Sequence, residues 1–494
     1  MWWKLKKRPG IEPLNQHTEL TEEQQRLAIR RKEMEAITQK QMAKNIFQIA
    51  WPATTEAILQ STIRIVTSAL LGHMPGSALA VSATGLADRI IRLSWGLFAA
   101  VGTGSTVMVA RSIGAGRQDR ANNFATQALV LGAVLMAAIT AVLLIFPTGL
   151  MNLLFNRNGD MDAELMDMAI YFMRITAWSV PLMGINQILG ALMRGAGNTR
   201  VTLITNTAAN LVNAGLGYIL IYGAFGAPQM GITGAAIATV VSQGVGAVLA
   251  LIIFFFFQKN LKPVLKAFRL KMESIKEVFA IGVPHASEMM LMQFGQIALA
   301  GLVGGMGAVA LAAHTQGIVA ESISFMPAMG FGIAATTLVG MSVGVGSVKM
   351  VKRYVRILAV CNLILTAFTA SILIFFPRQV FGLLSNDPEV IALGVSYLLI
   401  MGLCQFPQQQ TMVFAGVLRG SGDAKATLFN SLVGLWVVRI PLSFLFANTF
   451  GWGIMGVWWA MAVDLLVRFI LTITRYLRGR WKKTAIRIAG TEEL

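Results

Sequence analysis

The sequence is poor in charge for a chain of its length. Only 13% of its 494 residues are charged, about half of the roughly 25% that soluble domains carry. Hydrophobic residues make up 55% of the chain, and the mean hydropathy is +0.64. This balance excludes an ordinary soluble domain and predicts an integral membrane protein.

Residues that build disulfides, metal sites or nucleotide sites are also scarce, with 2 cysteines and 4 histidines. Cys361 and Cys404 fall in apolar stretches, where we interpret them as small apolar residues. His314 has no second ligand at metal-binding spacing, so we interpret it as an interfacial hydrogen-bonding residue. The glycine-rich segment 194–200 lacks the Gly-Lys-Ser/Thr of a phosphate loop. We therefore expect no metal, no cofactor and no catalytic constellation, and the chain is not predicted to be an enzyme.

The net charge of +18 does not indicate nucleic-acid binding, because its distribution follows the membrane. Lysine and arginine gather in alternate connections between apolar stretches, which is the positive-inside pattern. It places both termini in the cytoplasm and turns the basic charge toward anionic lipid. We expect a multi-pass protein of the cytoplasmic (inner) membrane. The basic connections are residues 111–120, 194–200, 259–276, 349–356, 419–425 and 475–487.

Twelve apolar stretches are long enough to cross the hydrocarbon core. A spanning segment must satisfy its own backbone polar groups, so these stretches are predicted to be helices. The fold class is therefore all-α, with six transmembrane helices in each half of the chain. No cleavable signal peptide is visible, and the segment before the first span is predicted to be an amphipathic cytoplasmic helix.

The second half of the sequence repeats the first. Residues 49–56 (IAWPATTE) recur at 281–288 (IGVPHASE), and residues 193–200 (MRGAGNTR) recur at 418–425 (LRGSGDAK). Two equivalent halves favour a substrate site between them and rocking about it. The predicted parts are an N-terminal segment 1–43, a first six-helix bundle 44–257, a basic linker 258–277, a second bundle 278–478 and a cytoplasmic tail 479–494.

The chain resembles the multidrug and toxic compound extrusion (MATE) family. The likeness is carried, in order, by residues 72–75 (GHMP), 110–116 (ARSIGAG), 310–314 (ALAAH) and 417–423 (VLRGSGD). It implies a V-shaped pair of bundles with a central cavity, and cation-driven export of organic molecules. The carboxylates that couple ions in the best-known branches do not transfer, because those places hold Thr67, Gly217 and the run 406–410 (FPQQQ).

Charges at membrane depth are costly and point to function. Glu56 is predicted to pair with Arg92 across a helix hairpin, as a structural ion pair or a coupling site. Its repeat partner, Glu288, faces Ser324 at the place that matches Arg92, so it is predicted to lack a cation. Glu321 lies at a similar depth. Two carboxylates on one cavity cannot both ionise cheaply, which favours protonation of at least one of them.

The candidate ion-coupling residues are thus Glu288, Glu321 and Glu56. The candidate substrate-cavity residues are Arg89, Arg92, Gln293, Gln296 and Asn210. Two further pairs are predicted to be structural: Asp88 with Arg64 or Arg89, and Asp464 with Arg468, which lie four residues apart on one helix. Pro52 and Pro284 precede the two repeated glutamates by one turn, as hinges or as fixed kinks.

These features favour a secondary antiporter, acting as a monomer on small organic solutes, which it exports in exchange for H⁺ or Na⁺ by alternating access. The alternative is an exporter of an anionic metabolite or lipid-linked substrate with the same two-bundle fold. Its support is the arginine set Arg64, Arg89, Arg92 and Arg174. A passive channel is disfavoured by the symmetric halves and their mid-depth carboxylates.

Overall fold

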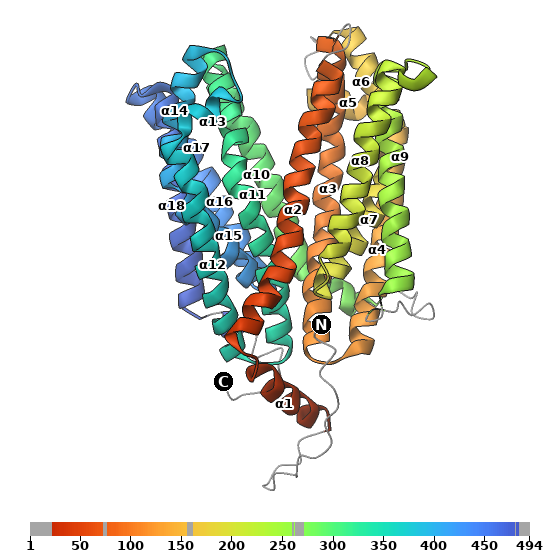
Figure 1. Ribbon diagram of the computed structural model, residues 1–494, viewed down its shortest axis with the longest axis vertical. Helices are drawn as coiled ribbons and strands as arrows, with labels where there is room; N and C mark the ends of the chain where they lie inside the picture. Colours follow the sequence, from red (N-terminus) through yellow and green to blue (C-terminus); the bar gives the residue numbers. More distant parts are fainter. Residues whose placement is uncertain are drawn as a thin grey trace.

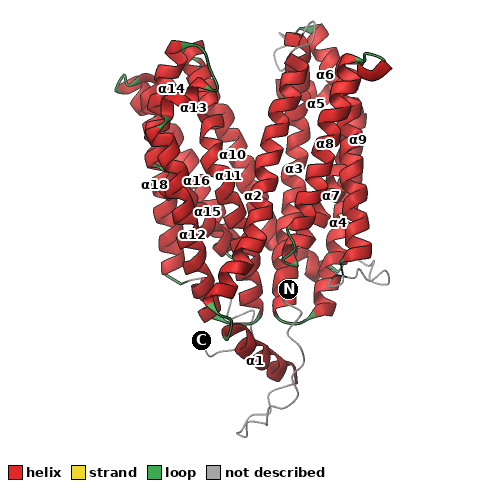
Figure 2. Cartoon of the chain, in the orientation of Figure 1, coloured by secondary structure: helices red, strands yellow, loops and turns green. Residues whose placement is uncertain are grey.

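The computed structural model describes residues 22–72, 77–155, 162–258, 261, 271–479 and 481–483, with the side chains of 22–24, 60–72, 77, 78 and 81 excepted. Every regular element among them is helical (Figure 2). The first half contains α1 (Glu22–Glu35), α2 (Gln39–Gly72), α3 (Ser77–Gly114), α4 (Gln118–Ile145), α5 (Pro147–Phe155), α6 (Ala163–Thr176), α7 (Ser179–Gly195), α8 (Arg200–Tyr222), the 3₁₀ turn η1 (Ala224–Gly226), α9 (Gly231–Ile252) and the π-helical η2 (Ile253–Phe257).

The second half follows the same order. It contains α10 (Met272–Gly304), α11 (Ala308–Gly344), α12 (Val348–Phe375), α13 (Pro377–Gly382), α14 (Pro388–Leu403), α15 (Gln405–Gly420), α16 (Ala424–Leu432), the π-helical η4 (Val433–Arg439), α17 (Ile440–Phe444), the π-helical η5 (Leu445–Thr449) and α18 (Gly453–Leu477). Two helices start earlier than predicted: α2 begins inside the predicted segment 1–43, and α10 inside the predicted linker 258–277.

The predicted twelve spans are confirmed. Among the described residues, 8 helices are long and apolar enough to cross a membrane, and two bent pairs bring the number to 10. The pairs are α6 with α7, bent by 50°, and α14 with α15, bent by 51°. The more polar α2 and α8 run alongside these spans and complete two six-helix bundles (Figure 1). Pro181 and Pro407 stand third in α7 and α15, in the first turn, where proline costs a helix least.

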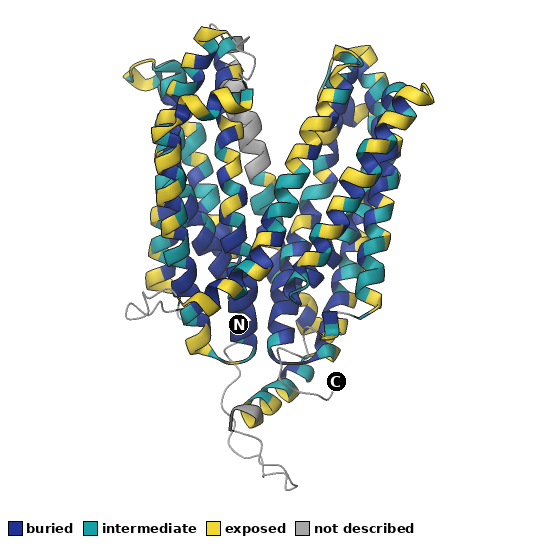
Figure 3. Ribbon diagram, turned by 180° about the vertical axis from the view of Figure 1, so that it is seen from behind, coloured by how far each residue is buried: buried dark blue, intermediate teal, exposed yellow. Residues whose placement is uncertain are grey.

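The two bundles form a V (Figure 1). They meet at the end near α1 and the described C-terminus and diverge toward the opposite end. Each bundle has its own buried core, and exposed residues lie along the outer helices of both bundles (Figure 3). Many of the exposed side chains are large and apolar, as a lipid-facing protein requires.

The first turns of α2 and α10 each pack into the core of the other bundle. Met42 and Ile46 of α2 belong to a core cluster with α11, α12 and α15, whereas Val278 and Ile281 of α10 belong to the core of the first bundle. Both helices therefore cross the boundary between the bundles before they reach Glu56 and Glu288. Pro52 and Pro284 lie inside these helices, just before the two carboxylates.

A pair of glycines closes the joined end of the V. Gly114 of α3 lies against the backbone oxygen of Met341, and Gly344 of α11 lies against that of Arg111, with no room for a Cβ at either. The two contacts are the same contact repeated, since 344 − 114 = 230 and 341 − 111 = 230. Only glycine allows two backbones to approach so closely.

Helix α1 lies across this joined end and contacts both bundles. Arg30 donates to the backbone oxygen of Ile113 at 2.9 Å, at the end of α3. Arg353 of α12 donates to the backbone oxygens of Glu35 at 2.9 Å and Ile37 at 3.1 Å. Met34 is 2% exposed within the second bundle's cluster. The predicted amphipathic lead-in is thus a helix that bridges the two bundles.

Candidate functional site

A cavity of about 820 Å³ lies within the second bundle, between α10, α11, α15, α16, η4 and α18. Its walls combine flexible and apolar side chains with a few charged and amide groups, which is the usual make-up of a small-molecule site. The apolar lining consists of Met292, Ile318, Val319, Phe325, Met326, Met412, Ala415, Met461 and Leu465. The charged lining consists of Glu288, Glu321, Arg419, Arg439 and Arg468.

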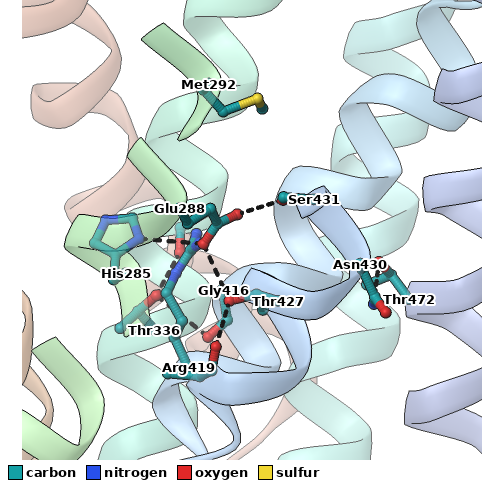
Figure 4. Close-up of polar contacts among 12 residues, drawn as sticks. His285, Glu288, Met292, Thr336, Gly416, Arg419, Thr427, Asn430, Ser431 and Thr472 are labelled. Carbon is teal, nitrogen blue, oxygen red and sulfur yellow. Dashed lines mark hydrogen bonds and ion pairs between the residues drawn. The ribbon is translucent and has the colours of Figure 1, made fainter. Parts of the chain in front are cut away.

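Glu288 of α10 is held by partners from three directions (Figure 4). Its Oε2 accepts from Arg419 Nη1 at 3.4 Å and from Thr427 at 3.1 Å, and Oε1 accepts from Ser431 at 2.9 Å. His285 Nδ1 lies 3.4 Å from Oε2. The prediction that Glu288 lacks a cation is wrong. Arg419 had been assigned to a cytoplasmic connection, but it is the next-to-last residue of α15 and reaches back into the bundle.

Glu56 occupies the equivalent place in the first bundle. Its Oε1 accepts from Asn206 Nδ2 at 2.6 Å, and Arg194 lies within electrostatic range. Asn206 and Arg194 are the repeat counterparts of Ser431 and Arg419, because 431 − 206 = 225 and 419 − 194 = 225. The predicted pair of Glu56 with Arg92 does not form. Arg92 lies 3.9 Å from Asp88, one turn earlier on α3.

Glu321 of α11 is a buried carboxylate with neutral partners. Tyr397 donates to its Oε2 at 2.7 Å and Gln405 Nε2 to its Oε1 at 3.4 Å. Its exposed fraction is 7%. Among the residues that the structure describes, no basic side chain forms an ion pair with it. The prediction of two carboxylates on one cavity is confirmed, but the one without a cation is Glu321 rather than Glu288.

Arg439, Asp464 and Arg468 form a buried triad on the cavity wall. Arg439 Nε and Nη2 both lie 2.7 Å from Asp464 Oδ2, and Arg468 Nη2 donates to the same oxygen. The predicted local pair of Asp464 with Arg468 is confirmed, and Arg439 joins it from the end of the π-helical η4. The triad places two positive charges around one negative charge.

The other predicted cavity residues divide between the two bundles. Gln293 and Gln296 line the cavity of the second bundle, whereas the sequence predicted a substrate site between the two halves. Arg89 and Arg92 are exposed on α3, and Asn210 is partly buried on α8; none of the three is among the residues that line this cavity. The side chain of Arg64 lies outside the described residues. Arg64 and Arg89 were the two predicted partners of Asp88. The ion pair that Asp88 forms on α3 is with Arg92 instead of Arg89.

His314 is buried in the protein and forms a hydrogen bond, because its Nδ1 accepts from Trp458 Nε1 at 3.3 Å. Its ring also packs edge-on against Tyr397, the partner of Glu321. Within the described part of the chain there is no group of three or more His, Cys, Asp or Glu side chains able to hold a metal ion. The histidine therefore belongs to the packing behind the Glu321 site.

Sequence reasoning missed Arg419, Arg439 and Tyr397 as site residues. A signal for Arg419 was present, because the repeated Leu/Met-Arg-Gly places an arginine at the same point of both halves. Arg439 stands within an apolar stretch, which marks it as an intramembrane charge, but the sequence offers no partner for it. Tyr397 gave no signal, because one tyrosine in an apolar stretch is an ordinary packing residue.

Comparison with known proteins gives a consistent result. The MatE family model matches residues 52–219 and 284–445. A Thermotoga maritima protein named "Probable multidrug resistance protein NorM" is 32% identical over 451 residues, which cover 90% of this chain and 94% of that protein. The "Multidrug resistance protein MdtK" of Pectobacterium atrosepticum is 25% identical, over 90% of this chain and 97% of that protein.

Solved structures share the fold. The crystal structure of MATE in the bent conformation superposes with a TM-score of 0.82 at 19% identity, covering 95% of this chain and 100% of that chain. An outward-facing conformation of a multidrug resistance MATE family transporter superposes with a TM-score of 0.81 at 20% identity, covering 91% and 97%.

Proposed function

This chain belongs to the MatE family of membrane transporters, and we propose that it exports amphipathic organic solutes in exchange for inward-moving H⁺ or Na⁺. The names of its relatives support the export of drug-like compounds. The cavity supports it as well, because its volume and its methionine-rich lining suit an adaptable apolar site.

The observation that carries the coupling proposal is Glu321. A buried carboxylate without a basic partner is costly, and its two donors, Tyr397 and Gln405, bring no charge. A proton or a sodium ion supplies the missing positive charge. A cationic group on a solute would supply it too, so the ion and the solute compete for one site. That competition is the minimal requirement of an antiporter, because each ligand favours a different state.

We place Glu288 second as a coupling candidate and Glu56 third. Glu288 already has Arg419, two hydroxyl donors and His285 around it, so an arriving cation would have to displace a formed ion pair. Glu56 lies in the bundle that does not contribute to the cavity. Both carboxylates sit where α2 and α10 cross between the bundles, which suits a role in holding the bundle geometry.

The proposed orientation puts the termini and α1 in the cytoplasm, so the V opens outward. The inward-open state then requires the crossing of Gly114 and Gly344 to separate. Rocking of the two bundles about their crossing helices would exchange one state for the other.

The test is counterflow in proteoliposomes under an imposed pH or sodium gradient, with Glu321→Gln and Glu288→Gln compared. Glutamine removes the charge of Glu321 and can keep both contacts, because its amide oxygen can accept from Gln405 and its amide nitrogen can donate to the Tyr397 hydroxyl. We expect the Glu321 variant to equilibrate solute without accumulating it against a gradient. We expect the Glu288 variant to retain gradient-driven accumulation. Full accumulation by Glu321→Gln, or its loss in Glu288→Gln alone, would move the coupling role to Glu288.

A further inference from the structure

The triad Arg439–Asp464–Arg468 carries more positive charge than its own carboxylate balances. All three side chains are buried, with exposed fractions of 5%, 0% and 8%. Asp464 Oδ2 accepts from both arginines, while Asp464 Oδ1 has no hydrogen-bond partner among the described residues. Arg468 Nη1 faces only the thioether of Met292, at 3.5 Å, and a thioether is a weak acceptor for a guanidinium group. Arg468 Nε has no partner among the described residues.

The nearby carboxylates are engaged elsewhere. Glu288 pairs with Arg419, and Glu321 accepts from Tyr397 and Gln405. Neither forms an ion pair with Arg439 or Arg468 in the described structure. No described carboxylate outside the triad bonds to the surplus guanidinium charge, although Glu288 lies within electrostatic range of Arg468. A buried guanidinium group that borders a cavity in this way can bind a carboxylate or phosphate group.

The internal repeat places uncharged residues at the corresponding positions of the first bundle. With the offset of the last repeated motif, 453 − 231 = 222, Asp464 corresponds to Ser242 and Arg468 to Gly246. Ser242 and Gly246 are uncharged residues of the first bundle, and Asn213 Nδ2 donates a hydrogen bond to Ser242 Oγ at 3.3 Å. The same helix position is thus neutral in one half and carries the charged triad in the half that has the cavity.

We propose that Arg439 and Arg468 form an oxyanion subsite of this cavity, which takes the carboxylate or phosphate of a zwitterionic amphiphile. The Arg468 edge now facing Met292 turns to the oxyanion as that thioether moves aside. The apolar body of the solute rests on Ile318, Phe325 and Met461. Its positive end lies toward Glu321, where it competes with the coupling ion. The subsite specifies the class of solute in the proposed export function. Its role in transport depends on that proposed function, whereas its binding of an oxyanion does not.

Binding is tested without any ion gradient, in purified full-length protein in a non-ionic detergent. The probe is Nε-dansyl-lysine, which is zwitterionic and fluoresces more strongly in apolar surroundings. Its methyl ester removes the negative charge only. Arg468→Gln leaves Arg439 and Asp464 as a balanced pair, so the variant is expected to fold. Arg475→Gln is the matched control, because Arg475 is on the same helix and pairs with Asp423 outside the cavity.

We expect Arg468→Gln to weaken binding of dansyl-lysine by about tenfold or more, the effect of losing one charge-assisted bond. Binding of the methyl ester should change by less than about twofold, since the ester makes no such bond. Arg468→Lys should recover part of the loss, and Arg475→Gln should bind both probes as the wild type does. Equal weakening of both probes by Arg468→Gln, or of neither, would overturn the subsite.

A lipid phosphate could meet the same two arginines. Addition of phosphatidylglycerol to the wild-type protein separates the two sources. We expect the lipid to leave dansyl-lysine bound; displacement of the probe by the lipid would assign the subsite to a headgroup and overturn its assignment to a solute. Failure of antiport in vesicles with binding intact would count against the proposed function and leave the subsite standing.

Discussion

Replacing Asp464 by asparagine should be among the most destabilising single changes available in the second bundle. The side chain is fully buried and its Oδ2 joins Arg439 and Arg468. Asparagine has nearly the same shape, but it leaves two guanidinium charges facing each other with no anion between them. Removal of one partner from a buried ion pair costs about 3–5 kcal/mol, and here two cations are stranded. We expect Asp464→Asn to lose at least about that much free energy of unfolding.

The informative comparison is Arg468→Gln. That change leaves the Arg439–Asp464 pair, with two nitrogens on one oxygen, and removes the surplus charge. We expect its cost to be within about 1 kcal/mol of zero, because a lost bond and a relieved excess charge oppose each other. The assay is unfolding in mixed detergent by SDS titration, with retention of helical signal as the readout. Equal costs for the two variants, or an Asp464→Asn protein as stable as the wild type, would refute the charge count on which this reasoning rests.

Three further predictions follow from the first bundle and the joined end of the V. Glu56→Gln should cost less than about 1 kcal/mol in the same unfolding assay, since its amide oxygen can still accept from Asn206; a larger loss would restore the structural ion pair predicted from the sequence. Gly344→Val should prevent closure at the α3–α11 crossing, so a cysteine pair placed across that crossing should crosslink less than in the parent protein; unchanged crosslinking would show that the contact is not tight. A cysteine placed in the 258–277 loop should resist an impermeant thiol reagent outside intact cells, and ready labelling there would reverse the proposed orientation.

Apolar runs and the internal repeat were enough to predict the architecture. Twelve stretches of sufficient length leave little choice but helices in lipid, and the repeat divides them into two bundles. Four residues named from the sequence line one cavity, although that cavity lies within the second bundle rather than between the halves: Gln293, Gln296, Glu288 and Glu321. Depth along a helix can be counted from the sequence at about 1.5 Å per residue, and these predictions depended on depth.

Partners were harder to predict because they depend on the direction in which a side chain leaves its helix. Glu56 and Arg92 were matched by depth, yet Arg92 turns to Asp88 on its own helix and Glu56 turns to Asn206 on α8. The repeat offered no cation for Glu288, because the next helix along the chain has Ser324 at the place that matches Arg92. Its partner Arg419 comes from α15, 131 residues away in the chain. Hydropathy patterns carry no information about which distant helix packs on which face.

The two halves share one arrangement of helices and differ in the charged side chains that these helices carry. That difference supports the proposed site in the second half. In both halves a glutamate follows a proline and lies near the arginine of a Leu/Met-Arg-Gly motif. Its Oε1 accepts a hydrogen bond from the helix that comes after that motif, from Asn206 in the first half and from Ser431 in the second. This arrangement occurs in both bundles, so it is a feature of the crossing helices α2 and α10. What the second half adds is Glu321 where the first has Arg89, and the charged triad where the first has Ser242 and Gly246. These additions border one cavity and carry opposite unbalanced charges. In the proposed antiport cycle, rocking of the two symmetric bundles exposes this asymmetric site to each side of the membrane in turn.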